Sequence, residues 1–123
     1  MNNKVLIVDD EENIRMLVHM VLENEGYEIH EASSGSEALA KAREIKPAVM
    51  ILDVMMVGKS GYEVCEELRH NPETENIYVI FLTARGSSIS EITGKKKGGN
   101  DFITKPFESA VLKQKVRNAI SRK

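Results

Sequence analysis

Features of secreted and membrane proteins are scarce in this sequence. The chain has one cysteine in 123 residues, so no disulfide can form within it, which fits a reducing compartment. Its longest apolar runs fall far short of the roughly 20 residues that a membrane helix needs. A signal-peptide pattern is also missing from the N-terminal segment. These absences predict a soluble, cytoplasmic protein that does not contact a membrane.

An excess of charge of one sign is missing as well. Lys and Arg total 17 and Asp and Glu total 19, which gives a net charge of −2. Without a basic field, the sequence gives no reason to expect direct contact with nucleic acid. A chain of this length can bury one well-formed core but not two. We therefore expect a single domain over residues 1–123.

What the sequence does contain is a repeated pattern of short apolar runs, each followed by a helix-like segment. The apolar runs predict strands at residues 4–8, 27–32, 48–53, 77–82 and 101–104. Apolar residues at helical spacing predict amphipathic helices at residues 14–25, 34–45, 61–71 and from about 107. Strands that alternate with helices over short connections indicate a parallel sheet covered on both faces.

A further helix, the fourth along the chain, is predicted over residues 87–99, and this prediction is the weakest. Gly94, Gly98 and Gly99 and the three lysines at 95–97 stand where a buried helical face should continue. Each glycine inside a helix costs about 1 kcal/mol relative to alanine. We therefore expect this segment to be the softest element of the fold and the lysines to form a solvated face.

Polar residues close four of the predicted strands. Asp9 and Asp10 follow the first strand, Asp53 ends the third, Thr83 follows the fourth and Lys105 the fifth. In a parallel sheet these ends lie at one edge, where ligands of open α/β sheets bind. Clustered carboxylates repel unless a cation joins them, and all-oxygen ligands favour magnesium. A carboxylate beside such an ion, a lysine and a hydroxyl suits attack on phosphorus to form an aspartyl phosphate.

These residues, in this order and at these separations, resemble the receiver domain of two-component response regulators. The motifs are Asp9-Asp10, the strand that ends at Asp53, Leu82-Thr83-Ala84, and Asp-Phe-Ile-Thr-Lys-Pro-Phe at 101–107. The resemblance covers essentially the whole chain. It implies a CheY-like, flavodoxin-like fold with five parallel strands in the order 2-1-3-4-5 and five helices on the two faces.

The resemblance also implies roles for the residues that handle the phosphoryl group. Asp53 matches the phosphoacceptor, Lys105 the lysine that pairs with the phosphoryl group, and Thr83 the switch hydroxyl. The backbone at Ala84 matches a phosphate-binding position, and Phe102 matches the switch aromatic. In this scheme Thr83 moves toward the phosphoryl oxygens, and Phe102 fills the space that Thr83 leaves.

A magnesium site follows from the same resemblance. Asp10 matches the direct ligand, with Asp53 and the backbone carbonyl of Met55 completing the protein ligands, and Asp9 matches an acid that acts through water. The family's Lys-Pro bond is cis, so we expect a cis peptide bond between Lys105 and Pro106.

The function implied is that of a phosphoacceptor switch in a two-component phosphorelay. The donor would be a phosphohistidine of a sensor kinase or phosphotransfer protein that docks on the helix at 14–25. Phosphorylation would shift the face at 83–107 to control a downstream target or a fused output domain. Whether phosphorylation also produces a homodimer is a question that the sequence leaves open. Such a chain is no conventional enzyme, although it catalyses its own phosphorylation. Met55 and Arg85 offer no carboxylate or amide to orient water, which predicts slow autodephosphorylation.

Three departures from the family's usual pattern stand out. Many receivers have proline four residues after the acceptor, where this chain has Val57. The fourth helix usually continues with Leu and Ala, where this chain has the lysines at 95–97. Alanine is typical at the position of Gly99. The output surface is therefore atypical, whereas the acids, threonine and lysine are complete.

Three other functions fit parts of the sequence. A magnesium-dependent phosphatase with an aspartyl phosphate intermediate would need a second aspartate where Met55 stands. A flavodoxin-like FMN carrier would need a Ser/Thr/Gly phosphate loop after the first strand, where this chain has four acids at 9–12. An unphosphorylated receiver-like scaffold for protein–protein interaction stays open as the alternative.

Overall fold

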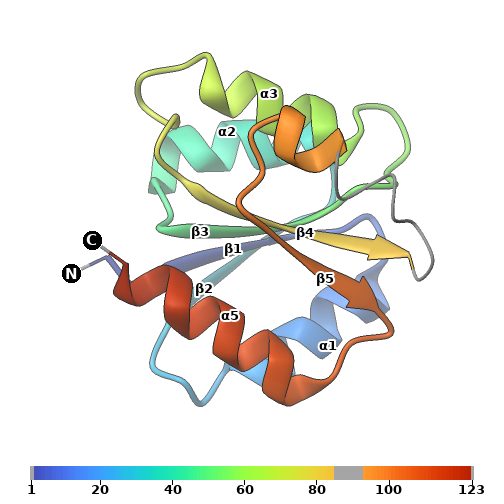
Figure 1. The fold of residues 1–123 in the computed structure, drawn as a ribbon, viewed down its shortest axis with the longest axis vertical. Helices are drawn as coiled ribbons and strands as arrows, with labels where there is room; N and C mark the ends of the chain where they lie inside the picture. Colours follow the sequence, from blue (N-terminus) through green and yellow to red (C-terminus); the bar gives the residue numbers. More distant parts are fainter. Residues whose placement is uncertain (1, 85–92, 123) are drawn as a thin grey trace.

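The computed structural model describes residues 2–84 and 93–122, which form a three-layer α/β/α arrangement (Figure 1). The strands are β1 (Lys4–Val8), β2 (Glu28–Ala32), β3 (Val49–Asp53), β4 (Tyr78–Ala84) and β5 (Asp101–Lys105). The helices are α1 (Glu12–Leu22), α2 (Gly35–Ile45), α3 (Gly61–Arg69) and α5 (Ser109–Ser121), and residues 93–96 are also helical. All neighbouring strands are parallel, in the order β2-β1-β3-β4-β5, so the predicted sheet is confirmed.

The central strand β3 explains the uninterrupted apolar run at 49–52. It pairs with β1 on one side and β4 on the other, and all five of its residues are buried. Its side chains alternate between two cores: Met50 and Leu52 pack on the face that α2 and α3 cover, while Val49 and Ile51 pack on the face of α1 and α5. A strand that is buried on both faces is apolar at every position, as expected for a parallel sheet.

Several element boundaries differ from those predicted by apolar spacing. Helix α1 begins at Glu12 rather than at 14 and ends at Leu22, ahead of Gly26, which adopts a φ of 88°. Strand β4 continues through Thr83 to Ala84, and α5 begins at Ser109 rather than at about 107. At α1 the added or lost residues are polar, so an apolar pattern gives no signal there, whereas at α5 the apolar Phe107 extended the predicted helix beyond its true start.

Side-chain caps fix the starts of α2 and α3. The Ser34 hydroxyl accepts a hydrogen bond from the Glu37 amide at the start of α2. At α3, Ser60 and Glu63 form a capping box, in which each side chain accepts a hydrogen bond from the backbone amide of the other residue. These caps matter for the site below, because α3 begins directly after the loop that follows Asp53.

The glycines that weakened the helix prediction over residues 87–99 have a packing explanation. Phe81 and Phe102 stack with ring centroids 5.8 Å apart. A Cβ atom added at Gly94 would lie 2.6 Å from Phe102, and one at Gly99 would lie 2.3 Å from Phe81. Glycine is thus the residue that lets the backbone at 94–99 approach these two rings. Residues 87–92 of the predicted helix lie outside the described residues.

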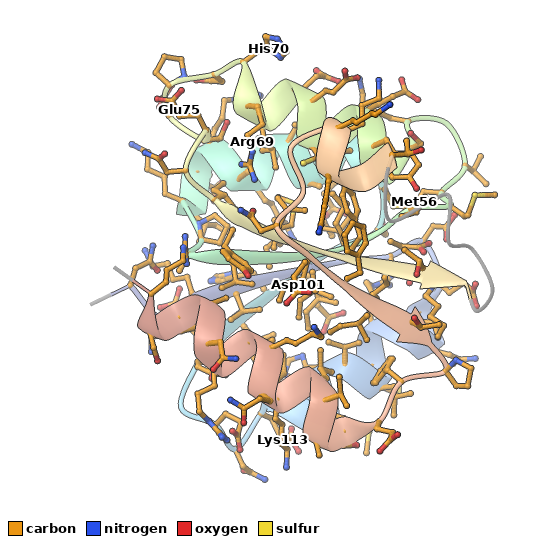
Figure 2. The ribbon with its side chains drawn as sticks, viewed as in Figure 1. Met56, Arg69, His70, Glu75, Asp101 and Lys113 are labelled. Carbon is orange, nitrogen blue, oxygen red and sulfur yellow. The ribbon has the colours of Figure 1, made fainter. Side chains whose placement is uncertain are left out.

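The backbone at 97–100 is also tied to α3 through polar side chains. The Arg69 guanidinium, labelled in Figure 2, donates hydrogen bonds to the Gly98 carbonyl at 2.7 Å and to Asn100 Oδ1 at 2.9 Å. Lys97 Nζ lies 3.1 Å from Glu66 Oε2 of α3, whereas Lys95 and Lys96 are exposed. The lysine run is therefore solvated at two positions and paired at the third.

Candidate functional site

The acidic residues of the predicted site meet at the C-terminal edge of the sheet. Asp53 is the last residue of β3, and Asp9 and Asp10 directly follow the neighbouring strand β1. Carboxylate oxygens of the three residues all lie within 4.8 Å of one another. Asp9 and Asp53 are buried, whereas Asp10 is exposed, so the cluster opens to solvent on the Asp10 side.

Lys105 lies between two of these acids. Its Nζ is 2.9 Å from Asp53 Oδ1 and 3.1 Å from Asp9 Oδ2. The lysine reaches this position because β5 ends at Lys105, which pairs in register with Ala84 at the end of β4. The Lys105–Pro106 peptide bond that follows is cis. Three carboxylates thus face one ammonium group, which leaves the cluster formally negative.

Backbone amides complete the hydrogen bonding of the three carboxylates. The Glu11 amide donates to Asp9 Oδ1 at 2.9 Å, and the Val57 amide donates to Asp10 Oδ2 at 3.1 Å. The Met55 amide donates to the Asp53 carboxylate. Each acid is therefore held by at least one group of the main chain.

Burial sets the ionisation of the central pair. The pKa of Asp53 is raised because the carboxylate is buried and lies near the charge of Asp9, and the Lys105 ammonium opposes this shift. Burial would lower the pKa of Lys105, but its hydrogen bonds to Asp53 and Asp9 and their charges outweigh burial and raise it. The lysine therefore stays charged, whereas the charged form of Asp53 is disfavoured.

The carboxylate cluster has the donor chemistry of a site for a small divalent cation. Its ligand atoms are hard oxygens that lie close enough to share one ion, and the exposed Asp10 leaves room for water ligands. Asp9, Asp10 and Asp53 could hold such an ion. The predicted role of the Met55 carbonyl stays a prediction, since the recorded contact of Met55 with Asp53 is through its amide.

The remaining predicted residues lie at the ends of β4 and β5. Thr83 is buried and pairs in register with Thr104, one residue before the Ala84–Lys105 pair. Phe102 is partly buried and packs against the core on the α2 and α3 side, where it stacks on Phe81. The acids and Lys105 are thus brought together, and Phe102 belongs to an adjoining aromatic cluster. Arg85 lies outside the described residues.

Sequence reasoning missed two contacts that support the acids. Arg15 of α1 donates a hydrogen bond to the Asp9 carbonyl at 2.8 Å and pairs with Glu31 of β2 at 3.3 Å. Nothing in the spacing separates Arg15 from the other charged residues of its helix. The second missed contact is the bond from Val57 to Asp10, which is made by the main chain and therefore leaves no trace in residue type.

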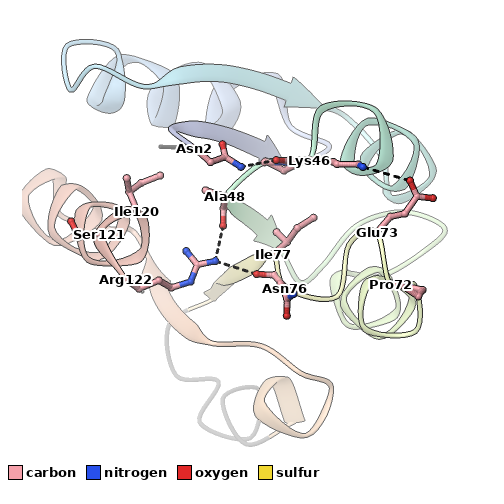
Figure 3. A pocket seen from close by; sticks show the side chains of 11 residues that line it. Asn2, Lys46, Ala48, Pro72, Glu73, Asn76, Ile77, Ile120, Ser121 and Arg122 are labelled. Atoms are coloured by element: carbon pink, nitrogen blue, oxygen red, sulfur yellow. Dashed lines mark hydrogen bonds and ion pairs between the residues drawn. The ribbon is translucent and has the colours of Figure 1, made fainter.

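Other features of the described chain offer less chemistry. A cavity of about 660 Å³ lies at the opposite, N-terminal edge of the sheet (Figure 3). Several of its polar side chains are already engaged: Asn2 donates to the Lys46 carbonyl at 2.8 Å, and Arg122 donates to the Ala48 carbonyl at 3.2 Å. The Cys65 thiol is buried, which raises its pKa to about 11 and makes it a poor nucleophile. Among the described residues, no helix has the length and apolar character needed to cross a membrane.

Comparison with known proteins places this arrangement in a family. The model of the response regulator receiver domain matches residues 5–117. The chain is 39% identical over 119 residues to the phosphate regulon transcriptional regulatory protein PhoB of Rhizobium meliloti, and 40% identical over 122 residues to the transcriptional regulatory protein SrrA of Staphylococcus aureus. These matches cover 97% and 99% of the chain but 52% and 49% of the relatives, so the chain spans about half of their length.

Solved structures agree with this assignment. A crystal structure from Chloroflexus aurantiacus, described as a response regulator, superposes with a TM-score of 0.94 at 36% identity and covers 99% of this chain and 100% of that one. The chemotaxis protein CheY4 of Vibrio cholerae superposes with a TM-score of 0.90 at 33% identity, with coverage of 97% and 99%. With three acids and a lysine gathered at the sheet edge, the chain belongs to the response regulator receiver domains, a family of phosphoacceptor signalling domains.

Proposed function

We propose that Asp53 accepts a phosphoryl group from a phosphohistidine of a sensor kinase or phosphotransfer protein, with Mg²⁺ bound beside it. The observation that carries this proposal is the position of Lys105 Nζ, 2.9 Å from Asp53 Oδ1 within a cluster of three carboxylates. Asp10, Asp53 and the Met55 carbonyl would bind the ion directly, and Asp9 would act through water. The bound ion would supply positive charge to offset that of the phosphoryl oxygens.

The chemistry requires little of the protein beyond charge and position. An oxygen of the Asp53 carboxylate attacks phosphorus, the bond from phosphorus to the donor imidazole nitrogen breaks, and that nitrogen takes up a proton. Lys105 balances the charge on the transferred group, and the Thr83 hydroxyl and Ala84 amide donate hydrogen bonds to its oxygens.

Phosphorylation would act on the ends of β4 and β5. The modification adds about −1.5 to −2 charges where acids already crowd together, so Lys105 and Thr83 gain new partners. Phe102 pairs in register with Phe81 and stacks on its ring. Phe81 lies two residues before Thr83 in β4, so their side chains share one face of the strand. We propose that this path carries the change to the face at 83–107, which controls a downstream target or fused output domain.

The exposed face of α1 supports docking of the phosphoryl donor there. Met16, Leu17 and Met20 are all large apolar residues that are about half exposed. Helix α1 begins two residues after Asp10, so a partner on this face lies beside the acids. Three exposed apolar side chains on one short helix are typical of a protein-binding surface.

Output and lifetime follow from the same proposal. PhoB and SrrA are transcriptional regulatory proteins, which favours control of transcription through a partner or an attached domain. The Met55 side chain is exposed and provides no group to orient water, so we expect slow loss of the phosphoryl group. The scaffold alternative is less favoured because it gives no reason for a lysine between two buried acids.

Incubation with acetyl phosphate and Mg²⁺, followed by intact-mass measurement, tests the proposal. One phosphoryl group should be gained by the wild type and none by Asp53→Asn, and a metal chelator should prevent the gain. An unmodified wild-type chain under these conditions would favour the scaffold alternative.

A further inference from the structure

The loop after Asp53 makes a contact with the metal site that the proposed function does not use. This loop, residues 54–60, sends the Val57 amide to Asp10, and the two residues are 47 positions apart in the sequence. The hydrogen bond to Asp10 Oδ2 is 3.1 Å long. In the part of the chain that the structure describes, no other hydrogen bond to the Asp10 carboxylate is recorded. The Val57 side chain is 88% exposed, so the contact depends on the main chain and not on valine itself.

The loop is anchored at both ends, which fixes the direction of this amide. At its start, the Val54 amide donates to the Leu82 carbonyl at 3.2 Å. At its end, the Gly61 amide donates to the Val54 carbonyl at 3.0 Å, and a Cβ atom on Gly61 would lie 2.3 Å from the Asp53 carbonyl oxygen. Gly58 allows the turn between them, with a φ of 83°.

We propose that the Val57 backbone amide is a positioning group for Mg²⁺, holding the exposed Asp10 carboxylate beside Asp9 and Asp53. This inference rests on the proposed function. Without the amide, repulsion from two buried acids within 4.8 Å would favour rotamers that turn the Asp10 carboxylate outward into water. A carboxylate has about four lone-pair positions on two oxygens, so Asp10 can keep the amide bond and still bind a cation.

The position of this group connects it to a departure from the usual receiver pattern. A proline at 57 would have no N–H and could not donate to Asp10. The valine therefore supplies an interaction that a chain with proline there must lack. The same loop also holds Asp53 through the Met55 amide, so one short segment orients two of the three acids.

A Mg²⁺ titration followed by NMR of the backbone amides tests this proposal without relying on phosphorylation. Val57→Pro removes the N–H, and Val57→Ala is its matched control, since alanine keeps the N–H and the native side chain is exposed. Replacement of residue 57 by its α-hydroxy analogue, which turns the amide into an ester, removes the donor without the ring of proline. We expect Val57→Ala to match the wild type, and the proline and ester variants to bind Mg²⁺ about tenfold more weakly.

The outcomes separate this inference from the proposed function. If the ester variant binds Mg²⁺ as tightly as Val57→Ala, the positioning role is wrong, even if the proline variant is impaired or misfolded. With saturating Mg²⁺ and acetyl phosphate, the ester variant should reach the wild-type extent of phosphorylation. If the wild type itself neither binds Mg²⁺ nor gains a phosphoryl group, the proposed function fails first, and the positioning role fails with it.

Discussion

The two edges of the sheet use polar residues in opposite ways. At the N-terminal edge, side-chain donors end on main-chain carbonyls: Asn2 binds the Lys46 carbonyl, and Arg122 binds the carbonyls of Ala48 and Asn76. At the C-terminal edge, three carboxylates face one another, and among the described residues a single lysine pairs with two of them. The hydrogen bonds at the N-terminal edge tie neighbouring segments of the chain together, whereas the C-terminal edge holds charged oxygens close together and partly exposed to a ligand.

The difference between the edges is also one of free energy. Each donor at the N-terminal edge gains a hydrogen bond, and Arg122 lies 4.8 Å from the centre of the Tyr78 ring. At the C-terminal edge, burial and the charge of Asp9 raise the pKa of Asp53, so its charged form is disfavoured in the fold. Destabilised groups that converge on one point are typical of functional sites. The comparison predicts that substitutions at the C-terminal edge will impair phosphorylation, whereas substitutions at the N-terminal edge will lower stability and leave phosphorylation unchanged.

The largest effect is expected for Asp53→Asn. The amide cannot attack phosphorus, so uptake of a phosphoryl group from acetyl phosphate should be lost completely. Arg122→Ala, a change at the other edge, should leave uptake unchanged. Intact-mass measurement of both variants checks this, and phosphorylation of Asp53→Asn to the wild-type extent would show that the acceptor lies elsewhere.

Lys105→Ala should slow phosphorylation strongly without abolishing it. Removal of one group that stabilises charge in a transition state costs about 10²- to 10³-fold in rate. Lys115→Ala is the matched control, because Lys115 Nζ lies at the same 2.9 Å distance from an aspartate, Asp101, away from the acidic cluster. Rates measured with acetyl phosphate distinguish them, and equal rates for the two variants would contradict the role given to Lys105.

Asp53→Asn should also make the fold more stable near neutral pH, because the amide carries no charge in the buried position. Because the pKa of Asp53 is raised in the fold, the folded chain still holds the Asp53 proton at pH values above 3.8, the ordinary pKa at which the unfolded chain loses it. The free energy of unfolding of the wild type therefore falls as pH rises from 3.8 through the pKa of Asp53 in the folded chain. The asparagine variant has no carboxyl group at this position and should not show this fall. Urea unfolding from pH 3 to 8 should give a gain that disappears at the acid end.

The smallest effect is expected at the N-terminal edge. Arg122→Ala removes hydrogen bonds to the carbonyls of Ala48, Asn76 and Ala119 and a contact with the Tyr78 ring, so we expect a loss of about 0.5–1 kcal/mol. Urea unfolding of the variant measures this loss. A variant that is as stable as the wild type but phosphorylates more slowly would reverse the assignment of the two edges.

The C-terminal edge could be predicted largely from the sequence, because its residues end apolar runs. Buried strands leave an unbroken apolar signal, and the first polar residue after each run marks the edge where the acids and Lys105 meet. The close approach of the backbone at Gly94 and Gly99 to two aromatic rings could not be predicted this way. It depends on Phe81 and Phe102, which come from different strands and meet only in the fold.

Main-chain contacts are the other part that residue types do not reveal. The amides of Met55 and Val57 orient two acids, yet any residue except proline carries such a group. The contact of Arg15 with the Asp9 carbonyl likewise depends on how α1 lies against the sheet. Sequence patterns therefore located the candidate reacting groups, whereas the structure was needed to find what holds them.

Mapping the phosphoryl group is the most direct test of the central claim. The chain would be incubated with acetyl phosphate and Mg²⁺ and then treated with borohydride, which reduces an aspartyl phosphate to homoserine. Peptide masses would then locate the change. We predict a single modification at Asp53. Modification at another residue, or none at all, would contradict the account.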